Sequence, residues 1–323
     1  MKLIKPKKLI SKTPIEEFRF KEPGIKTRIF LKRDDLNGLL ISGNKARKLE
    51  YLIADALNKR CDSIITCGPV QSNHCRTAVA FARHFGLTPY LVLRGKEQKI
   101  PTGNILIDRL LNAQITYISM KQYEDHRIEI MNRLAQKLAR KGEKAYIVPE
   151  GGSNEIGALG YLNCMREMAG FIKKEKIDAV YCAVGSGGTY AGLLLGKKLL
   201  KVDVDLNGVI ICDTVPYFTE KILDICERAI SRFNMKIKIE QNDINLIDGY
   251  VGQGYAIPYQ EEVEIIKRVA KTGIILEPVY TGKTFYGMLQ QLKVKKYKKV
   301  IFIHTGGLFS IFAFNKTLFS SRN

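Results

Sequence analysis

The chain alternates short apolar runs with amphipathic segments from about residue 45 onward. Each β-branched run is followed by a turn that contains glycine and then by apolar residues at helical spacing. This alternation is typical of an α/β fold, in which helices cover both faces of mostly parallel sheets. The pattern predicts helices near 74–85 and 103–112, and it predicts strands at 63–67, 89–93, 115–118, 145–148, 179–184, 207–212 and 299–303.

The length of 323 residues fits about two domains or one large α/β domain. No internal repeat and no Pro/Gly-rich linker marks a boundary, and the turn at 149–153 is the best candidate for a crossing between two lobes. Ligands of parallel sheets bind beyond the carboxyl ends of the strands. We therefore expect the functional residues in turns that directly follow strands.

The composition excludes several classes of protein. A hydrophobic content of 46% supplies a core, so the chain is not disordered. No apolar stretch is long enough for a membrane helix, and the basic N-terminal segment lacks the apolar core of a secretory signal, so we expect a cytoplasmic protein. The seven cysteines include no Cys-x-x-Cys pair, which favours free thiols and indicates neither disulfides nor a metal site.

The charge is strongly basic, with 52 Lys and Arg against 32 Asp and Glu and a formal net charge of +20. Clustered cations would favour a nucleic-acid-binding protein. The lysines, however, are spread along the chain and are dense only at the N-terminus and at 293–299, and such runs are usually solvated faces. No nucleic-acid-binding signature is present, so we expect no nucleic-acid partner and keep this class as an alternative.

The first candidate site is the turn at 42–48, which opens a helix with apolar residues at helical spacing. Lys45, Arg47 and Lys48 crowd its first turns. The helix N-terminus disfavours each exposed cation there by roughly 0.3–1 kcal/mol, so a bound anion such as a phosphate is the simplest compensation. The same field and burial would lower the pKa of Lys45 and make its amine available for imine formation. Alternatively, Lys45 is an ordinary surface lysine.

Two further glycine-containing turns follow predicted strands. In the turn at 68–76, Ser72, Asn73 and His74 either cap a helix or present polar groups to a substrate carboxylate. The turn after 179–184 can form a phosphate cradle or a tight turn, and it consists of Gly185, Ser186, Gly187, Gly188 and Thr189. A nicotinamide-binding fingerprint would need a third glycine where Tyr190 stands. A nicotinamide oxidoreductase would also leave the cations at 45–48 unexplained.

The chain resembles the D-cysteine desulfhydrase/1-aminocyclopropane-1-carboxylate (ACC) deaminase family of pyridoxal-phosphate (PLP) enzymes. Five motifs carry the resemblance in this order: Gly-Asn-Lys-Ala-Arg-Lys-Leu-Glu, Gln-Ser-Asn-His, Gly-Ser-Gly-Gly-Thr, Pro-Val-Tyr-Thr-Gly-Lys and His-Thr-Gly-Gly. The likeness extends from residue 32 to residue 307. It implies a two-lobed fold of the tryptophan-synthase-β type, with a small domain at 48–156, a large domain at 1–47 and 157–323, and a homodimer.

The resemblance also implies roles for individual residues. Lys45 would bind PLP as an imine, while Lys48 and the 185–189 turn would hold its phosphate. Asn73 would contact the phenolic oxygen of the cofactor, and the amides of 72–74 would bind the substrate carboxylate, which makes Ser72, Asn73 and His74 substrate-binding residues. The substrate would be faced by Ser72, Tyr255 and Tyr280, and the pyridine ring by Thr281 and Thr305.

The reaction implied is α,β-elimination from D-cysteine or a similar β-substituted D-amino acid, giving pyruvate, sulfide and ammonia. Freed Lys45 would act as the general base for the α-proton. The alternative is ACC deamination to 2-oxobutyrate and ammonia. ACC deaminases of the family carry Glu and Leu where this chain has Thr281 and Thr305, and typically Gln where it has His74, so we expect the elimination.

Overall fold

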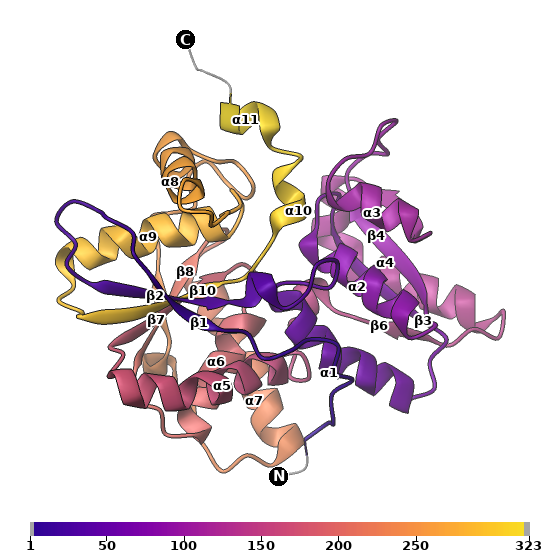
Figure 1. The fold of residues 1–323 in the computed structure, drawn as a ribbon. Coiled ribbons are helices and arrows are strands. Elements are labelled where there is room, and N and C mark those ends of the chain that lie inside the picture. The colour runs from indigo at the N-terminus through magenta and orange to yellow at the C-terminus, as the bar shows by residue number, and fades with distance from the viewer. Residues whose placement is uncertain (1–2, 320–323) are drawn as a thin grey trace.

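The computed structural model describes residues 3–319 and contains two sheets, one in each of two lobes (Figure 1). The sheet of the large lobe has six strands in the order β1-β2-β10-β7-β8-β9, and only the β1–β2 pair is antiparallel. Its strands are β1 (Ile15–Phe18), β2 (Arg28–Arg33), β7 (Ala179–Val184), β8 (Asp205–Ile210), β9 (Asn245–Ile247) and β10 (Lys299–His304).

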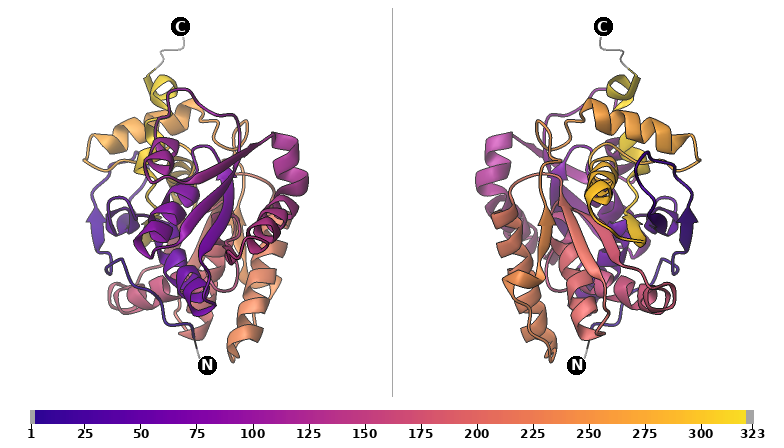
Figure 2. Two further views of the ribbon diagram at one scale, coloured as in Figure 1. Left: turned by 90° about the vertical axis from the view of Figure 1, so that its right-hand side faces the viewer. Right: turned by 90° about the vertical axis from the view of Figure 1, so that its left-hand side faces the viewer.

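The sheet of the small lobe is parallel throughout and has the order β5-β4-β3-β6. Its strands are β3 (Ser63–Pro69), β4 (Thr88–Arg94), β5 (Gln114–Ile118) and β6 (Ala145–Ile147). Helix α4 packs on one face, and helices α2 and α3 pack on the other, as the left view of Figure 2 shows. These helices span α2 (Asn73–His84), α3 (Asn104–Leu110) and α4 (Met120–Ala139).

Alternating apolar residues build the two cores of the large lobe. In β10, Ile301 and Ile303 face the cluster under α5, α6 and α7, whereas Val300 and Phe302 face the cluster under α8 and α9. Burial of both faces explains why these strands are apolar almost throughout. The helices of this lobe are α5 (Leu159–Glu175), α6 (Gly188–Leu199), α7 (Val215–Phe233), α8 (Gln260–Ala270), α9 (Thr281–Val294), α10 (Leu308–Ile311) and α11 (Asn315–Phe319).

Helix α1 (Asn44–Asn58) leads from the large sheet into the small lobe, and the chain returns through the 3-10 turn η2 (Glu150–Gly152). The two sheets therefore fall on either side of the expected domain division. The exact boundaries at 47/48 and 156/157 stay a prediction, because the first of them lies within α1. Residues 1–2 and 320–323 of the expected large domain lie outside the described range.

The α/β class and all seven strands expected from the sequence are confirmed. Strand β8 ends at residue 210 rather than 212, so Cys212 lies in the turn that follows it. The seven cysteines are free thiols, as expected. The run at 293–299 is mostly exposed, and none of the helices within 3–319 is long and apolar enough to cross a membrane.

Candidate active site

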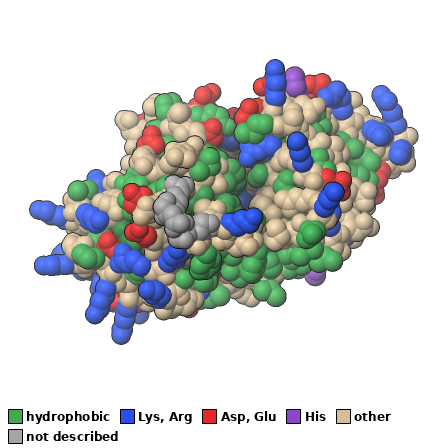
Figure 3. Space-filling view, turned by 90° about the horizontal axis from the view of Figure 1, so that it is seen from above, with side chains coloured by type: hydrophobic (Ala, Val, Ile, Leu, Met, Phe, Trp, Pro, Cys, Tyr) green, Lys and Arg blue, Asp and Glu red, His purple; other side chains and the backbone are tan. Residues whose placement is uncertain are grey.

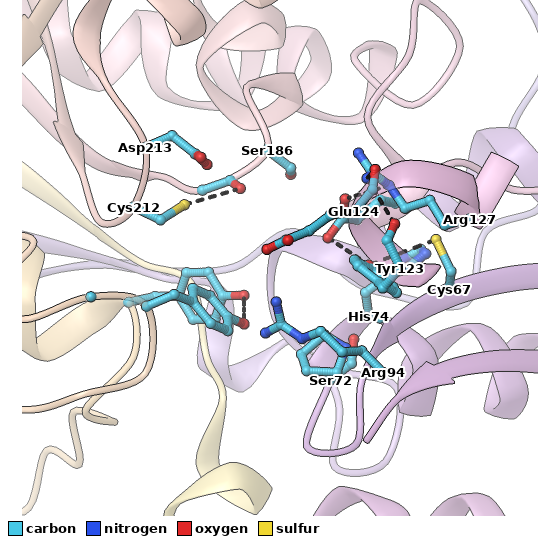
Figure 4. A pocket seen from close by; sticks show the side chains of 18 of the residues that line it. Cys67, Ser72, His74, Arg94, Tyr123, Glu124, Arg127, Ser186, Cys212 and Asp213 are labelled. Atoms are coloured by element: carbon cyan, nitrogen blue, oxygen red, sulfur yellow. Dashed lines mark hydrogen bonds and ion pairs between the residues drawn. The ribbon is translucent and has the colours of Figure 1, made fainter. Parts of the chain in front are cut away.

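A cavity of about 570 Å³ lies between the lobes, where the carboxyl ends of strands from both sheets meet. Figure 3 shows the corresponding hollow, with Lys and Arg side chains near it. Residues from both lobes line the cavity (Figure 4). Of the expected site residues, the structure brings seven to its wall: Lys45, Ser72, His74, Gly185, Ser186, Tyr255 and Tyr280.

Lys45 lies in the first turn of α1, where the chain packs tightly against the end of β10. The Asn44 amide donates to the Thr305 carbonyl at 3.1 Å, and a Cβ at Gly43, which has a φ of 81°, would lie only 2.4 Å from that oxygen. Only glycine fits this junction. Lys45 is 8% exposed, and burial lowers the pKa of its amine to about 8, although the negative charge of Glu150 acts to raise it. About a quarter of the amine is therefore neutral at pH 7.5, far more than for an ordinary lysine.

Lys48 lies one turn further along α1 and is fully buried. Its Nζ donates to the Gly151 carbonyl at 3.2 Å and to Ser153 Oγ at 3.1 Å. Burial, followed by the nearby charge of Lys45, holds the pKa of Lys48 well below its usual value. An anion beside Lys48 would therefore stabilise the charged form of this amine.

Arg47, the third cation of this turn, has a structural role instead. Its guanidinium points away from the cavity wall and forms ion pairs with Asp34 at 2.8 Å and Glu167 at 2.9 Å. Asp34 also accepts from the Tyr161 hydroxyl at 2.6 Å. Arg47 therefore anchors α1 to the large lobe.

Ser153 connects the glycine-rich turn at 185–189 to Lys48 by hydrogen bonds. The Gly188 amide donates to Ser153 Oγ at 3.3 Å, and the hydroxyls of Ser153 and Ser186 lie 2.8 Å apart. A Cβ at Gly151 would meet Ser186 Oγ at 2.4 Å and Lys45 Nζ at 3.3 Å. Three chain segments thus converge on one point with an amide, two hydroxyls and a buried amine, which is the chemistry of a phosphate cradle.

At the start of α2, Ser72 both caps the helix and lies on the cavity wall, so the two interpretations of the turn at 68–76 do not exclude each other. Ser72 Oγ caps the helix by accepting from the Cys75 amide at 3.1 Å, and Ser72 also lines the cavity. Asn73 lies behind the wall, where its Oδ1 accepts from Asn104 Nδ2 at 2.8 Å. Asn104 therefore fixes the orientation of the Asn73 amide.

His74 is buried on the cavity wall and is held by Thr66. Thr66 Oγ1 lies 2.9 Å from the Val148 carbonyl oxygen and 2.8 Å from Nε2 of His74, and these two contacts fix the orientation of the ring. Nδ1 of His74 has no hydrogen-bond partner within residues 3–319. Burial, with Lys45 and Lys48 nearby, keeps the pKa of His74 well below its usual value, so the ring is neutral.

Tyr255 and Tyr280 form a pair on the large-lobe side of the cavity. Their hydroxyl oxygens lie 2.6 Å apart, and Lys45 Nζ lies 6.0 Å from the centroid of the Tyr280 ring. Burial raises the pKa of both phenols, so both stay protonated at neutral pH. The pair can supply a proton close to the reactive amine.

Thr281 and Thr305 are buried behind the wall, as are Lys48, Gly187, Gly188 and Thr189, whereas Asn73 is half-buried. Thr281 Oγ1 accepts from the Glu277 amide at 2.8 Å. The Glu277 carboxylate accepts from the amides of Val279, Tyr280 and Thr281, so it caps the start of α9 rather than facing the cavity.

Several residues on the wall were not expected from the sequence, among them Glu150, Tyr123 and Arg94. Glu150 Oε1 accepts from the Tyr123 hydroxyl at 2.7 Å, and Arg94 lies over the Tyr123 ring. Glu150 and Ser153 belong to the turn that we interpreted only as a domain crossing. Arg94 directly follows the strand predicted at 89–93, which was a usable signal, because ligands bind where parallel strands end.

The arrangement fits a cofactor that combines an aldehyde with a phosphate. Lys45 supplies a buried amine of lowered pKa, and the cradle of Lys48, Ser153 and the 185–189 turn supplies donors for an anion. His74 adds, on the same wall, a buried ring nitrogen without a partner among the described residues. These features define a PLP-dependent enzyme.

Comparison with known proteins agrees with that class. The model of the family described as pyridoxal-phosphate dependent enzyme matches residues 7–306. The chain is 43% identical over 311 residues to a Thermotoga maritima protein named provisionally as an ACC deaminase, and the match covers 95% of this chain and 97% of the relative. It is 36% identical to a bifunctional D-cysteine desulfhydrase/ACC deaminase of Arabidopsis thaliana, over 93% of this chain and 77% of the relative.

A solved structure described as an ACC deaminase homologue has a TM-score of 0.87 and 37% identity, and the match covers 97% of this chain and 95% of that chain. The chain therefore belongs to the PLP-dependent family whose members carry the names ACC deaminase and D-cysteine desulfhydrase. Its fold is of the tryptophan-synthase-β type, and its cofactor is PLP. The homodimer, the cytoplasmic location and the role of each site residue stay predictions.

Proposed function

We propose that the enzyme catalyses α,β-elimination of D-cysteine, or of a similar β-substituted D-amino acid, to pyruvate, sulfide and ammonia. The single observation that carries the proposal is the neutral hydroxyl of Thr281 at the start of α9, next to the tyrosine pair. The name of the Arabidopsis relative, which includes D-cysteine desulfhydrase, supports the same reaction.

In this proposal, Lys45 carries the cofactor, and Lys48, Ser186 and the amides of the 185–189 turn hold its phosphate. Asn73 contacts the phenolic oxygen, and Thr281 and Thr305 face the pyridine ring. When bound, PLP withdraws electrons from the α-carbon of the substrate.

The protein supplies the proton transfers. The Lys45 amine takes the α-proton in its neutral form, which burial makes more abundant by lowering the pKa to about 8. The amides at the start of α2, with Ser72 and His74, bind the substrate carboxylate. The protonated Tyr255–Tyr280 pair donates a proton to the departing thiolate. Packing of the two lobes around the cavity keeps these groups partly out of water.

Thr281 favours the elimination over ACC ring opening. A carboxylate next to the pyridine nitrogen would stabilise its protonated form, whereas a neutral hydroxyl supports that charge far less. A thiolate accepts electrons as it leaves, so a weaker electron sink suffices. Opening a carbon ring that has no leaving group demands a stronger sink. The buried carboxylate of Glu277 does not change this argument, because three backbone amides engage it.

The test is turnover by the holoenzyme with D-cysteine, L-cysteine and ACC side by side. We expect sulfide and pyruvate from D-cysteine, at least tenfold less from L-cysteine, and little 2-oxobutyrate from ACC. Efficient 2-oxobutyrate release from ACC without sulfide release from D-cysteine would contradict the proposal and favour the deaminase alternative.

A further inference from the structure

Arg94 stands at the carboxyl end of the small sheet, beside the turn that leads to Ser72. It is the last residue of β4, and its register neighbours are Pro69 on β3 and Ile118 on β5. The side chain extends from the strand into the cavity (Figure 4). This guanidinium is therefore available to a molecule bound between the lobes.

Aromatic rings, and no anion, surround the guanidinium of Arg94. Its central carbon lies 5.4 Å from the ring centroid of Tyr123 in the small lobe and 5.6 Å from that of Tyr255 in the large lobe. Within residues 3–319, the side chain of Arg94 forms neither a hydrogen bond nor an ion pair. Two aromatic contacts stabilise the cation but leave its five N–H donors without acceptors.

Arg127 offers a direct comparison on the same wall. Its guanidinium also lies over the Tyr123 ring, at 5.3 Å, but its Nε lies 3.5 Å from a carboxylate oxygen of Glu150. Glu150 is held in turn by the Tyr123 hydroxyl. The other carboxylates of the wall, Glu124 and Asp213, form no ion pair with Arg94 in the described chain. Of the two stacked guanidiniums, only Arg94 lacks an anionic partner.

We propose that Arg94 selects substrates whose side chain ends in a carboxylate or a similar oxyanion. A guanidinium held between aromatic faces presents its N–H fork at its edge, which matches the two oxygens of such a group. Tyr255 stacks on Arg94 and shares a hydrogen bond with Tyr280, which lies near Lys45, so an anion bound by Arg94 lies in the same cavity as the reactive amine. The inference rests on the proposed function and narrows its substrate class to β-substituted D-alanines with an anionic substituent.

S-carboxymethyl-D-cysteine is a substrate of this class. Lys45 takes the α-proton, the bond between Cβ and sulfur breaks, and its electron pair leaves with thioglycolate. Water then converts the remaining three-carbon fragment to pyruvate and ammonia. S-carbamoylmethyl-D-cysteine has nearly the same size and loses its substituent by the same step, but this substituent is neutral. A comparison of the two compounds therefore isolates the effect of the charge on the substituent.

The first experiment measures binding without turnover. Calorimetry on the holoenzyme gives the Kd of D-aspartate and of its neutral isostere D-asparagine, which both lack a β-leaving group. We expect D-aspartate to bind about 10- to 150-fold more tightly, the range for a hydrogen-bonded charged pair. Arg94→Gln should reduce this ratio to within threefold of one, and Arg94→Lys should retain part of it.

Arg127→Gln is the matched control, because it removes the same charge from the same wall. Arg127 already faces Glu150, so its loss should leave the aspartate/asparagine ratio within threefold of the unmodified enzyme. If Arg94→Gln lost affinity equally for D-aspartate and for D-asparagine, the inference would be overturned. Such a result would assign Arg94 to the α-carboxylate, which both ligands carry. A wild-type enzyme that does not prefer D-aspartate would also overturn it.

The second experiment measures pyruvate release from the two S-substituted D-cysteines. We expect kcat/KM to favour the carboxymethyl compound by a similar factor, mostly through KM, and Arg94→Gln to abolish the preference. If neither compound nor D-cysteine releases pyruvate, the proposed elimination fails. The binding ratio still decides the role of Arg94 in that case, so the two failures are distinguishable.

Discussion

Replacing Lys48 by methionine separates a cofactor-binding role from a structural one. Lys48 is fully buried, and within residues 3–319 its amine has two acceptors, both neutral: Gly151 O and Ser153 Oγ. The loss of these hydrogen bonds costs about 0.5–1.5 kcal/mol each. Burial disfavours the charged form of Lys48, and its replacement by an apolar side chain of similar volume regains a desolvation cost of roughly 1–3 kcal/mol. The two effects offset each other, so the apoprotein should be no less stable than the unmodified apoprotein.

The cofactor complex should respond in the opposite direction. Loss of one charge-assisted contact to the phosphate costs about 1.5–3 kcal/mol, which raises the Kd of PLP about 10- to 150-fold. Absorbance titration of the apoprotein with PLP gives this Kd, and thermal unfolding gives the stability. The colour of the bound cofactor should return at high PLP concentration.

Arg47→Met is the matched control in the same helix. Arg47 is buried against Asp34 and Glu167. Its removal leaves the fully buried Asp34 carboxylate without its ionic partner, while Glu167 keeps Lys32, and this should destabilise the apoprotein by about 3–5 kcal/mol. A Lys48→Met protein that behaved in this way, with clear destabilisation and unchanged PLP affinity, would refute the phosphate role of Lys48.

Two further predictions concern pH. Burial lowers the pKa of the Lys45 amine from 10.5 to about 8, so about a quarter of the amine is neutral at pH 7.5. The rate of PLP association with the apoprotein should therefore level off above pH 8. A rate that still rises towards pH 10 would show that Lys45 is an ordinary lysine. Burial raises the pKa of Asp108 to about 8 against the opposing charge of Arg76, so the folded state keeps a proton that the unfolded state releases near pH 4. The contribution of Asp108 to stability should therefore fall between pH 4 and pH 8, by at most about 1.4 kcal/mol per pH unit, and the urea-unfolding profile of Asp108→Asn should differ from that of the unmodified protein by the loss of this slope.

The sequence predicted the apolar strands well, because burial on both faces leaves a continuous hydrophobic run. It missed β1, β2 and β9 for different reasons. Strand β2 has a buried apolar centre between charged ends, and β1 pairs only along one edge with two exposed glutamates. Strand β9 has three residues and only one strand beside it. Such strands depend on pairing across the sheet, which no local pattern records.

The turns that follow strands were recognised, but their partners were not. The motifs around Lys45, Ser72 and Gly185 predicted three segments of the cavity wall, which the structure brings together. Ser153 links the segment that contains Lys48 to the turn at 185–189. It does so only because the turn at 149–153, by which the chain returns to the large lobe, passes between the starts of α1 and α6. Arg94 looked like one basic residue among 52, because its lack of an anionic partner is a property of the assembled cavity.

The most direct test of the account is the identification of the lysine that carries PLP. The holoenzyme is reduced with borohydride and digested, and the modified peptide is sequenced by mass spectrometry. The account predicts that the pyridoxyl group is on Lys45 and that Lys45→Ala loses both the borohydride-sensitive colour and at least 10²–10⁴-fold of the activity, roughly the contribution of a general base. A label on Lys48 or any other lysine, or a reducible linkage that persists in Lys45→Ala, would contradict it.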